Sequence, residues 1–186
     1  MASHSDGVSD RVLDRVLGKT ADRTASSKSE VLLELQRLDV GSAVAVIGHP
    51  IHVMLVHFPV AFVVATLGVD VFYWWSADAF WLRAGVWASG MAFWSGVAAS
   101  IVGTGELLLV RGIRLHEASW SHAIAAMTLV AIAGASWGLR LTDPASVLPH
   151  GLVLSAIASV MVGFAGWHGG KLVFDHGIGI LVSPKD

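Results

Sequence analysis

Between residues 51 and 75 the chain reads IHVMLVHFPVAFVVATLGVDVFYWW. This run is longer than the roughly 20 apolar residues that an α-helix needs to cross the hydrocarbon of a bilayer. Asp70 is its only acidic side chain, and no Lys or Arg interrupts it. The stretch therefore predicts a membrane-spanning helix.

Three further apolar runs of similar length follow, at residues 81–110, 121–141 and 148–172. Of all 186 residues, 54% are hydrophobic and 14% are charged, against about 45–50% and about 25% in an ordinary soluble domain. The links between the runs are short, so successive helices are expected to be antiparallel. The predicted fold class is all-α, an integral membrane up-down four-helix bundle.

Residues 1–47 differ from the rest, with six Lys/Arg and seven Asp/Glu. They lack the apolar stretch of a signal peptide. Apolar side chains recur at helical spacing in 8–17 and in 31–38, which predicts an amphipathic helical N-terminal tail that binds the bilayer surface or a partner subunit. A partly disordered tail is the alternative. The expected domains are residues 1–47 and 48–186.

The distribution of basic residues predicts the orientation. Ten of the twelve Lys and Arg residues fall on the side that holds both termini and the link between the second and third runs, whereas Arg83 and Arg140 fall on the other side. Because cytoplasmic loops are enriched in Lys and Arg, both termini are expected in the cytoplasm. Asp70 is expected to pair with Arg83 or Arg140 across the outer surface.

Nine histidines in so apolar a chain need an explanation, because ionisable side chains in membrane segments are costly and tend to mark function. Seven of them converge on the inner ends of the four predicted spans: His49, His52, His57, His116, His122, His168 and His176. The chain has no Cys, which excludes a thiolate nucleophile and Cys-ligated metal centres within it. Nothing in the sequence indicates nucleic-acid binding.

Facing imidazoles in a helical bundle are typical of b-type heme, which needs two axial nitrogens, a flat apolar slot and cations for its propionates. His57 and His122 are the preferred axial pair and the preferred metal ligands. His52, His168 and His176 are the alternates. The propionates are expected near Arg111, Arg114 and Lys171. The predicted function is a cytochrome b-like electron-transfer subunit, rather than a stand-alone enzyme, that exchanges electrons with a quinone or with a redox partner bound through residues 1–47.

Two other interpretations stay open. In the first, the histidines and Glu106 bind a non-heme metal ion. In the second, the chain has no cofactor and anchors or assembles a larger complex. Near the inner end of the first span, Pro59 removes a helix hydrogen bond and is expected to kink the helix beside His57. Gly169, Gly170, Gly177 and Gly179 are expected to loosen or end the fourth helix, so that residues 171–176 bend beneath the bundle. An ordinary helix exit with a flexible tail is the alternative.

Three segments together resemble a known family: GHPIHVMLVHFP at 48–59, SHA at 121–123 and GWHGGKLVFDHGIG at 166–179. The chain resembles the bacterial membrane proteins of domain-of-unknown-function family 2231 over about residues 48–180. The resemblance implies four spans in the bacterial cytoplasmic membrane and no settled activity. Some relatives are joined to a Rieske-type iron–sulfur domain, which suggests electron transfer. The family's usual histidines fall on His52, His57, His122 and His176, and His168 stands where relatives often have an apolar residue.

Overall fold

A computed structural model describes residues 41–47 and 49–179, all within the compact unit Asp39–Asp186. The two amphipathic helices expected in the tail lie outside the described residues. The described part begins with a two-stranded antiparallel hairpin, β1 (Ala45–Val46) and β2 (His49–Pro50), in which Val46 pairs with His49.

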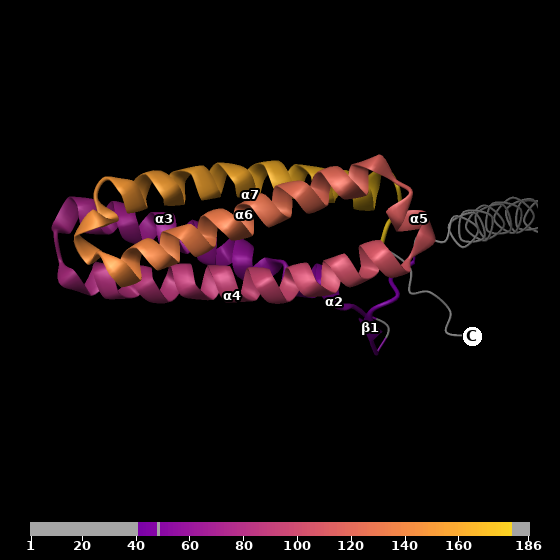
Figure 1. The fold of residues 1–186 in the computed structure, drawn as a ribbon, viewed down its shortest axis with the longest axis horizontal. Helices are drawn as coiled ribbons and strands as arrows, with labels where there is room; N and C mark the ends of the chain where they lie inside the picture. The colour runs from indigo at the N-terminus through magenta and orange to yellow at the C-terminus, as the bar shows by residue number, and fades with distance from the viewer. Residues whose placement is uncertain (1–40, 48, 180–186) are drawn as a thin grey trace, which may run out of the picture. The chain divides into compact units, whose positions relative to one another are not determined.

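Four long helical segments follow and lie side by side (Figure 1). The first consists of α2 (Ile51–Leu55) and α3 (His57–Ser76). The others are α4 (Ala79–Leu109), α6 (Glu117–Thr142) and α7 (His150–Phe174). Helix α3 packs against α4 and α7, and α6 packs against the same two helices. The all-α four-helix bundle that the sequence predicted is therefore confirmed.

The links are short, as expected, and two of them contain an Asp whose side chain accepts a hydrogen bond from a backbone amide. Asp78 Oδ1 accepts a hydrogen bond from the Phe80 amide at 2.8 Å and so caps the start of α4. Asp143 Oδ1 accepts one from the Ala145 amide at 3.1 Å at the start of the 3₁₀ turn η1 (Pro144–Val147). The link between α4 and α6 contains one extra helical turn, α5 (Arg111–Arg114).

The break between α2 and α3 falls at Val56, three residues before Pro59. Pro59 has no amide hydrogen, so it cannot donate to the carbonyl of Leu55, and the helix is interrupted there. The irregularity predicted beside His57 is thus present. Helix α7, in contrast, continues through Gly169 and Gly170 to Phe174. The prediction was therefore wrong for Gly169 and Gly170. It is confirmed for Gly177, which lies just beyond the end of α7 and has a left-handed φ of 66°.

The centre of the bundle is narrow and built mainly from small side chains. Val63, Ala92, Leu129, Ala133 and Ala158 form its buried cluster. In each of the four long segments, only 22–28% of the most apolar 18-residue window is buried. Most of the apolar surface therefore faces outward, which is stable in lipid and not in water. The molecule is a multi-pass membrane protein.

Candidate functional site

His52 lies in α2 and extends across to α4. Its Nδ1 is 3.0 Å from the carbonyl oxygen of Ala99. The imidazole lies directly on Gly103, one turn further along α4, where an added Cβ would come within 2.5 Å of the His52 Cε1 atom. A glycine at position 103 is therefore what allows the ring to lie between the two helices.

His122 makes an equivalent contact from the second turn of α6 to α7. Its Nδ1 is 3.1 Å from the carbonyl oxygen of Ala165. The ring packs against Gly169, where a Cβ would lie 3.0 Å from the His122 Cε1 atom. Each histidine thus forms a hydrogen bond with a backbone carbonyl of the neighbouring helix. Its ring occupies the space left by the glycine that lies four residues after that carbonyl's residue in the same helix.

The two rings face each other at the end of the bundle where α2 and α6 begin, which we call the histidine end. Their centroids are 6.3 Å apart and their planes cross at 79°. A carbonyl oxygen can only accept a hydrogen bond, so in both rings Nδ1 carries the hydrogen. In the neutral imidazole, Nε2 then has the free lone pair. Donation of the second ring nitrogen to a carbonyl is also the usual arrangement of metal-binding histidines.

The separation of the rings suits two ligands on opposite sides of one metal ion. A metal lies about 2 Å from an imidazole nitrogen, and the ring centre lies roughly 1 Å beyond that nitrogen, which places opposed ring centres about 6 Å apart. The observed separation of 6.3 Å agrees with this value. The separation of the two ring centres therefore allows His52 and His122 to hold one metal ion between them.

His57 and His168, which the sequence also selected, do not join this pair. His57 is exposed, and its Nδ1 is 3.3 Å from the carbonyl of Met54 in the preceding turn. His168 Nδ1 is 3.0 Å from the carbonyl of Phe164, and its ring packs on that phenyl group. In the described part of the chain His122 meets His52 and not His57, because His52 and His57 are about 140° apart around a helix.

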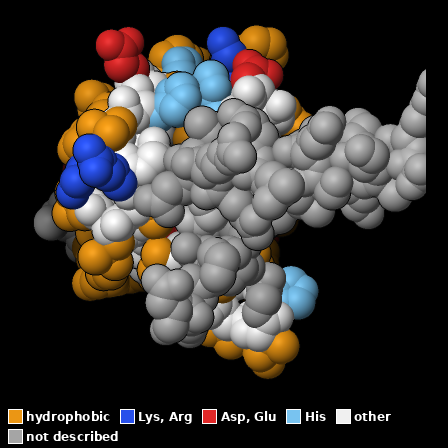
Figure 2. Space-filling model, turned by 90° about the vertical axis from the view of Figure 1, so that its right-hand side faces the viewer, with side chains coloured by type: hydrophobic (Ala, Val, Ile, Leu, Met, Phe, Trp, Pro, Cys, Tyr) orange, Lys and Arg blue, Asp and Glu red, His pale blue; other side chains and the backbone are white. Residues whose placement is uncertain are grey.

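His176 meets His116 instead, with ring centroids 4.2 Å apart. Arg111, Arg114 and Lys171 are all exposed, and Arg114 Nη1 donates to the carbonyl of Leu108 at 3.1 Å. Figure 2, which views this end of the bundle, shows histidine side chains beside acidic and basic ones. The cations expected near the propionates thus lie at the same end as the histidines.

Glu106 is buried at the histidine end, and Ser42 donates a short hydrogen bond to its Oε1. Ser42, which the sequence places in the N-terminal tail, thus contacts α4 at this end of the bundle. Within residues 41–47 and 49–179, no three His, Asp or Glu side chains are grouped closely enough to bind one metal ion. Glu106 therefore does not complete a three-residue site with the His52 and His122 pair in this arrangement.

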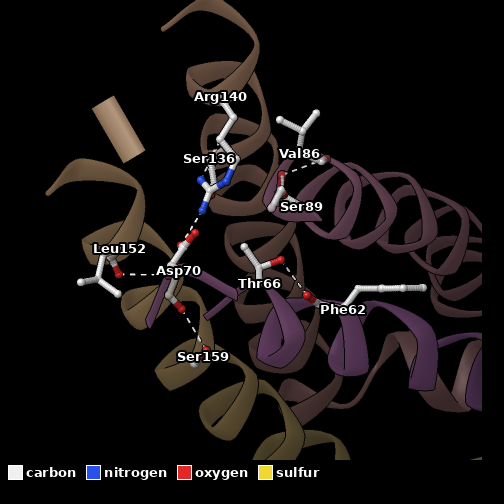
Figure 3. Close-up of polar contacts among 11 residues, drawn as sticks. Phe62, Thr66, Asp70, Val86, Ser89, Ser136, Arg140, Leu152 and Ser159 are labelled. Atoms are coloured by element: carbon white, nitrogen blue, oxygen red, sulfur yellow. Dashed lines mark hydrogen bonds and ion pairs between the residues drawn. The ribbon is translucent and has the colours of Figure 1, made fainter. Parts of the chain in front are cut away.

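The other end of the bundle contains a buried ion pair between Asp70 and Arg140 (Figure 3). Arg140 Nη2 lies 2.5 Å from Asp70 Oδ2, and the two side chains are 0% and 1% exposed. Arg140 Nη1 also donates to Ser136 Oγ at 3.1 Å. The pairing with Arg140 that the sequence suggested is confirmed, but it lies inside the bundle and joins the opposite helices α3 and α6, not across the surface.

Two glycines make room for the guanidinium group. A Cβ at Gly151 would lie 3.0 Å from Arg140 Nη1, and one at Gly85 would lie 3.4 Å from Arg140 Nε. The nearby hydroxyls of Thr66 and Ser89 donate to carbonyls of their own helices, at 2.7 Å in both cases. Arg140 Nε has no hydrogen-bond partner within the described residues, but the other polar groups bond within the fold, so we interpret the Arg140 end as structural.

Three features of these sites were not predicted from the sequence: the burial of Arg140, the contact of His116 with His176, and the glycines against which the imidazoles pack. Signals for two of them were present. Ser136, one turn before Arg140, offers a partner on the same helix face. The small residues Ala99 and Gly103, four apart, mark a face where another group approaches closely. No sequence signal identified His116 and His176 as neighbours.

The fold and these sites define a four-span, all-α membrane protein with polar side chains concentrated at both ends of the bundle. The chain belongs to the family described as "Predicted membrane protein (DUF2231)", whose model matches residues 48–181. The resemblance seen in the sequence is thereby confirmed. Comparison with curated proteins and with solved structures finds no match.

Proposed function

We propose that this protein is a membrane-embedded electron-transfer subunit that binds one b-type heme through His52 and His122. The observation that carries the proposal is the facing pair itself: two imidazoles 6.3 Å apart, each with Nδ1 bonded to a backbone carbonyl. His52 thus takes the role that the sequence first gave to His57, and His122 keeps its role.

The number of donors at His52 and His122 favours heme over zinc. A structural or catalytic zinc site uses three or four side-chain ligands, and the described residues group no three His, Asp or Glu side chains for this purpose. Heme iron takes four nitrogens from the porphyrin and needs only two from the protein. A non-heme metal ion is the second candidate, with water completing its coordination, and the experiment below separates the two.

The protein would contribute orientation and charge, and bound heme would supply one-electron transfer. The carbonyls of Ala99 and Ala165 hold the rings in the tautomer that leaves Nε2 free. Helix α2 has five residues and is separated from α3 at Val56, so it is the element best able to move when a ligand enters. Arg111, Arg114 and Lys171 provide positive charge for the propionates.

The charge distribution supports the bacterial cytoplasmic membrane as the location, with both termini and the heme on the cytoplasmic side. With a single heme near one face, the chain alone would not carry electrons across the bilayer. We infer that it exchanges them with a quinone or with a redox partner subunit, which residues 1–47 would bind.

The test is the visible spectrum of the purified protein, oxidised and then reduced with dithionite, with iron analysis of the same sample. We expect a sharp b-type band in the reduced wild-type protein. The band should be lost in His52→Ala and in His122→Ala and retained in the matched control His57→Ala, which removes an exposed histidine of the same segment.

The other outcomes have definite meanings. Loss of the band in His57→Ala but not in His52→Ala would overturn the assignment of the axial pair. A colourless protein that contains a stoichiometric transition metal would favour the non-heme candidate. A protein that contains no metal and does not bind added hemin would overturn both and support a cofactor-free anchor or assembly subunit.

A further inference from the structure

A second pair of histidines lies at the histidine end, outside the spanning helices. His116 immediately precedes α6, and His176 follows the last residue of α7, Phe174. Their ring centroids are 4.2 Å apart and their planes are inclined by 44°. Both side chains are partly exposed, so an ion can reach them from water.

Backbone hydrogen bonds fix both residues before any ligand binds. The His116 carbonyl accepts from the Ser119 amide at 3.1 Å, and the His116 amide donates to the carbonyl of Ile113 at 3.2 Å. Beyond His176, Gly177 adopts a left-handed φ of 66°, and the Ile178 amide donates to the carbonyl of Leu172 at 3.0 Å. This is the hydrogen bond of a glycine-terminated helix end, and it holds the His176 backbone against the bundle.

The ring centroids of His116 and His176 are closer together than those of His52 and His122. This difference affects the geometry in which each pair could bind a metal ion. A metal ion lies about 2 Å from an imidazole nitrogen, and the ring centre lies roughly 1 Å further away. Two imidazoles bound at right angles to each other therefore have ring centres about 4.4 Å apart, and two imidazoles bound at the tetrahedral angle have ring centres about 5.1 Å apart. The value of 4.2 Å for His116 and His176 is close to the first of these. Right-angle ligands occur in square-planar and octahedral coordination.

We propose that His116 and His176 form a binding site for a divalent transition-metal ion, of the class of Cu(II) or Ni(II), at the histidine end of the bundle. The two imidazoles occupy adjacent positions on the ion, and water fills the others. The bound ion links the start of α6 to the segment that follows α7. This site shares no residue with the His52 and His122 pair and does not depend on the heme proposal.

The test uses the full-length protein in detergent, in a His4→Ala background that removes a competing histidine near the N-terminus. Cu(II) is titrated and its electron paramagnetic resonance recorded, and Ni(II) binding is measured by calorimetry. We expect one tight equivalent whose spectrum shows two coordinating nitrogens. His116→Ala and His176→Ala should each weaken binding about tenfold or more, since loss of even a supporting residue around a metal costs 10–100-fold.

The matched control is His150→Ala, which removes an exposed histidine at the start of α7, at the opposite end. It should leave the tight equivalent unchanged. The proposal is overturned if His116→Ala and His176→Ala bind both ions as the control does, in which case the two rings only stack. The reduced heme spectrum of the same variants reports separately on the first site, so the two proposals can fail independently.

Discussion

The two ends of the bundle use polar side chains in opposite ways. At one end, Asp70 and Arg140 are fully buried and bonded to each other. At the other end, His52 and His122 are partly exposed, and each commits one ring nitrogen to a carbonyl and keeps the other. A buried ion pair holds helices together, whereas an imidazole nitrogen that remains free can bind a ligand. The difference distinguishes a stabilising site from the proposed ligand-binding site within a single bundle.

The largest effect is expected at the Arg140 end. Arg140→Met should reduce the free energy of unfolding by about 3–5 kcal/mol, because Asp70 stays buried without its partner. The double variant Asp70→Leu with Arg140→Met should recover most of this loss, since no charge is then left unpaired. Both are measured by denaturant unfolding in detergent. Arg83→Met, an exposed arginine of α4, is the control, and an equal loss in that variant would contradict the assignment.

At the histidine end, the closest contact should be the most sensitive one. Gly103→Ala places a Cβ within 2.5 Å of the His52 ring, so we expect a cost of about 1–3 kcal/mol and displacement of His52 from His122. The readouts are thermal unfolding and hemin affinity. Gly105→Ala is the matched control, because a Cβ there meets nothing within 4 Å, and it should leave both unchanged or slightly raise stability.

The packing of His122 should be less sensitive. Gly169→Ala brings a Cβ to 3.0 Å from that ring, whereas Gly170→Ala, its neighbour in α7, meets nothing within 4 Å. We expect weaker hemin binding in Gly169→Ala than in Gly170→Ala, by a smaller factor than in Gly103→Ala. If the two α7 variants bound hemin equally, the contact between His122 and α7 would not position the ring.

The smallest effect concerns Ser42. Ser42→Ala removes a donor to the buried Glu106 carboxyl group, and a buried acceptor that loses a partner costs about 1 kcal/mol or somewhat more. Thermal unfolding should show this as a small decrease. Ser121→Ala, an exposed hydroxyl that bonds only its own helix turn, should show none, and equal behaviour of the two variants would argue against a structural contact of Ser42.

The four helices could be predicted because a membrane span is a local property: about 20 apolar residues in succession are enough to define it. The partners of individual side chains are not local. His52 and His57 lie at the same end of the same segment, and only the helix register and the break at Val56 decide which of them faces His122. The burial of Arg140 depends likewise on glycines in two other helices, α4 and α7.

The position of His176 shows the same limit. The sequence predicted that His176 lies at the same end of the bundle as the other histidines, and this is correct. Its actual neighbour, His116, follows from the length of α7, which runs four residues past the glycine pair 169–170. Glycine lowers the helix propensity of an isolated segment. In the bundle, Gly169 packs against the His122 ring and α7 stays helical. A local sequence pattern cannot reveal this contact between two helices.

The measurement that most directly tests the division between the two ends is the ratio of bound heme to protein chain in two variants, His52→Ala and Arg140→Met. Both are loaded with hemin and separated from free hemin and aggregates by gel filtration. We expect His52→Ala to lose the heme while remaining monodisperse, and the folded fraction of Arg140→Met to keep a wild-type ratio despite its lower stability. Full heme occupancy in His52→Ala, or its loss from folded Arg140→Met, would contradict the account.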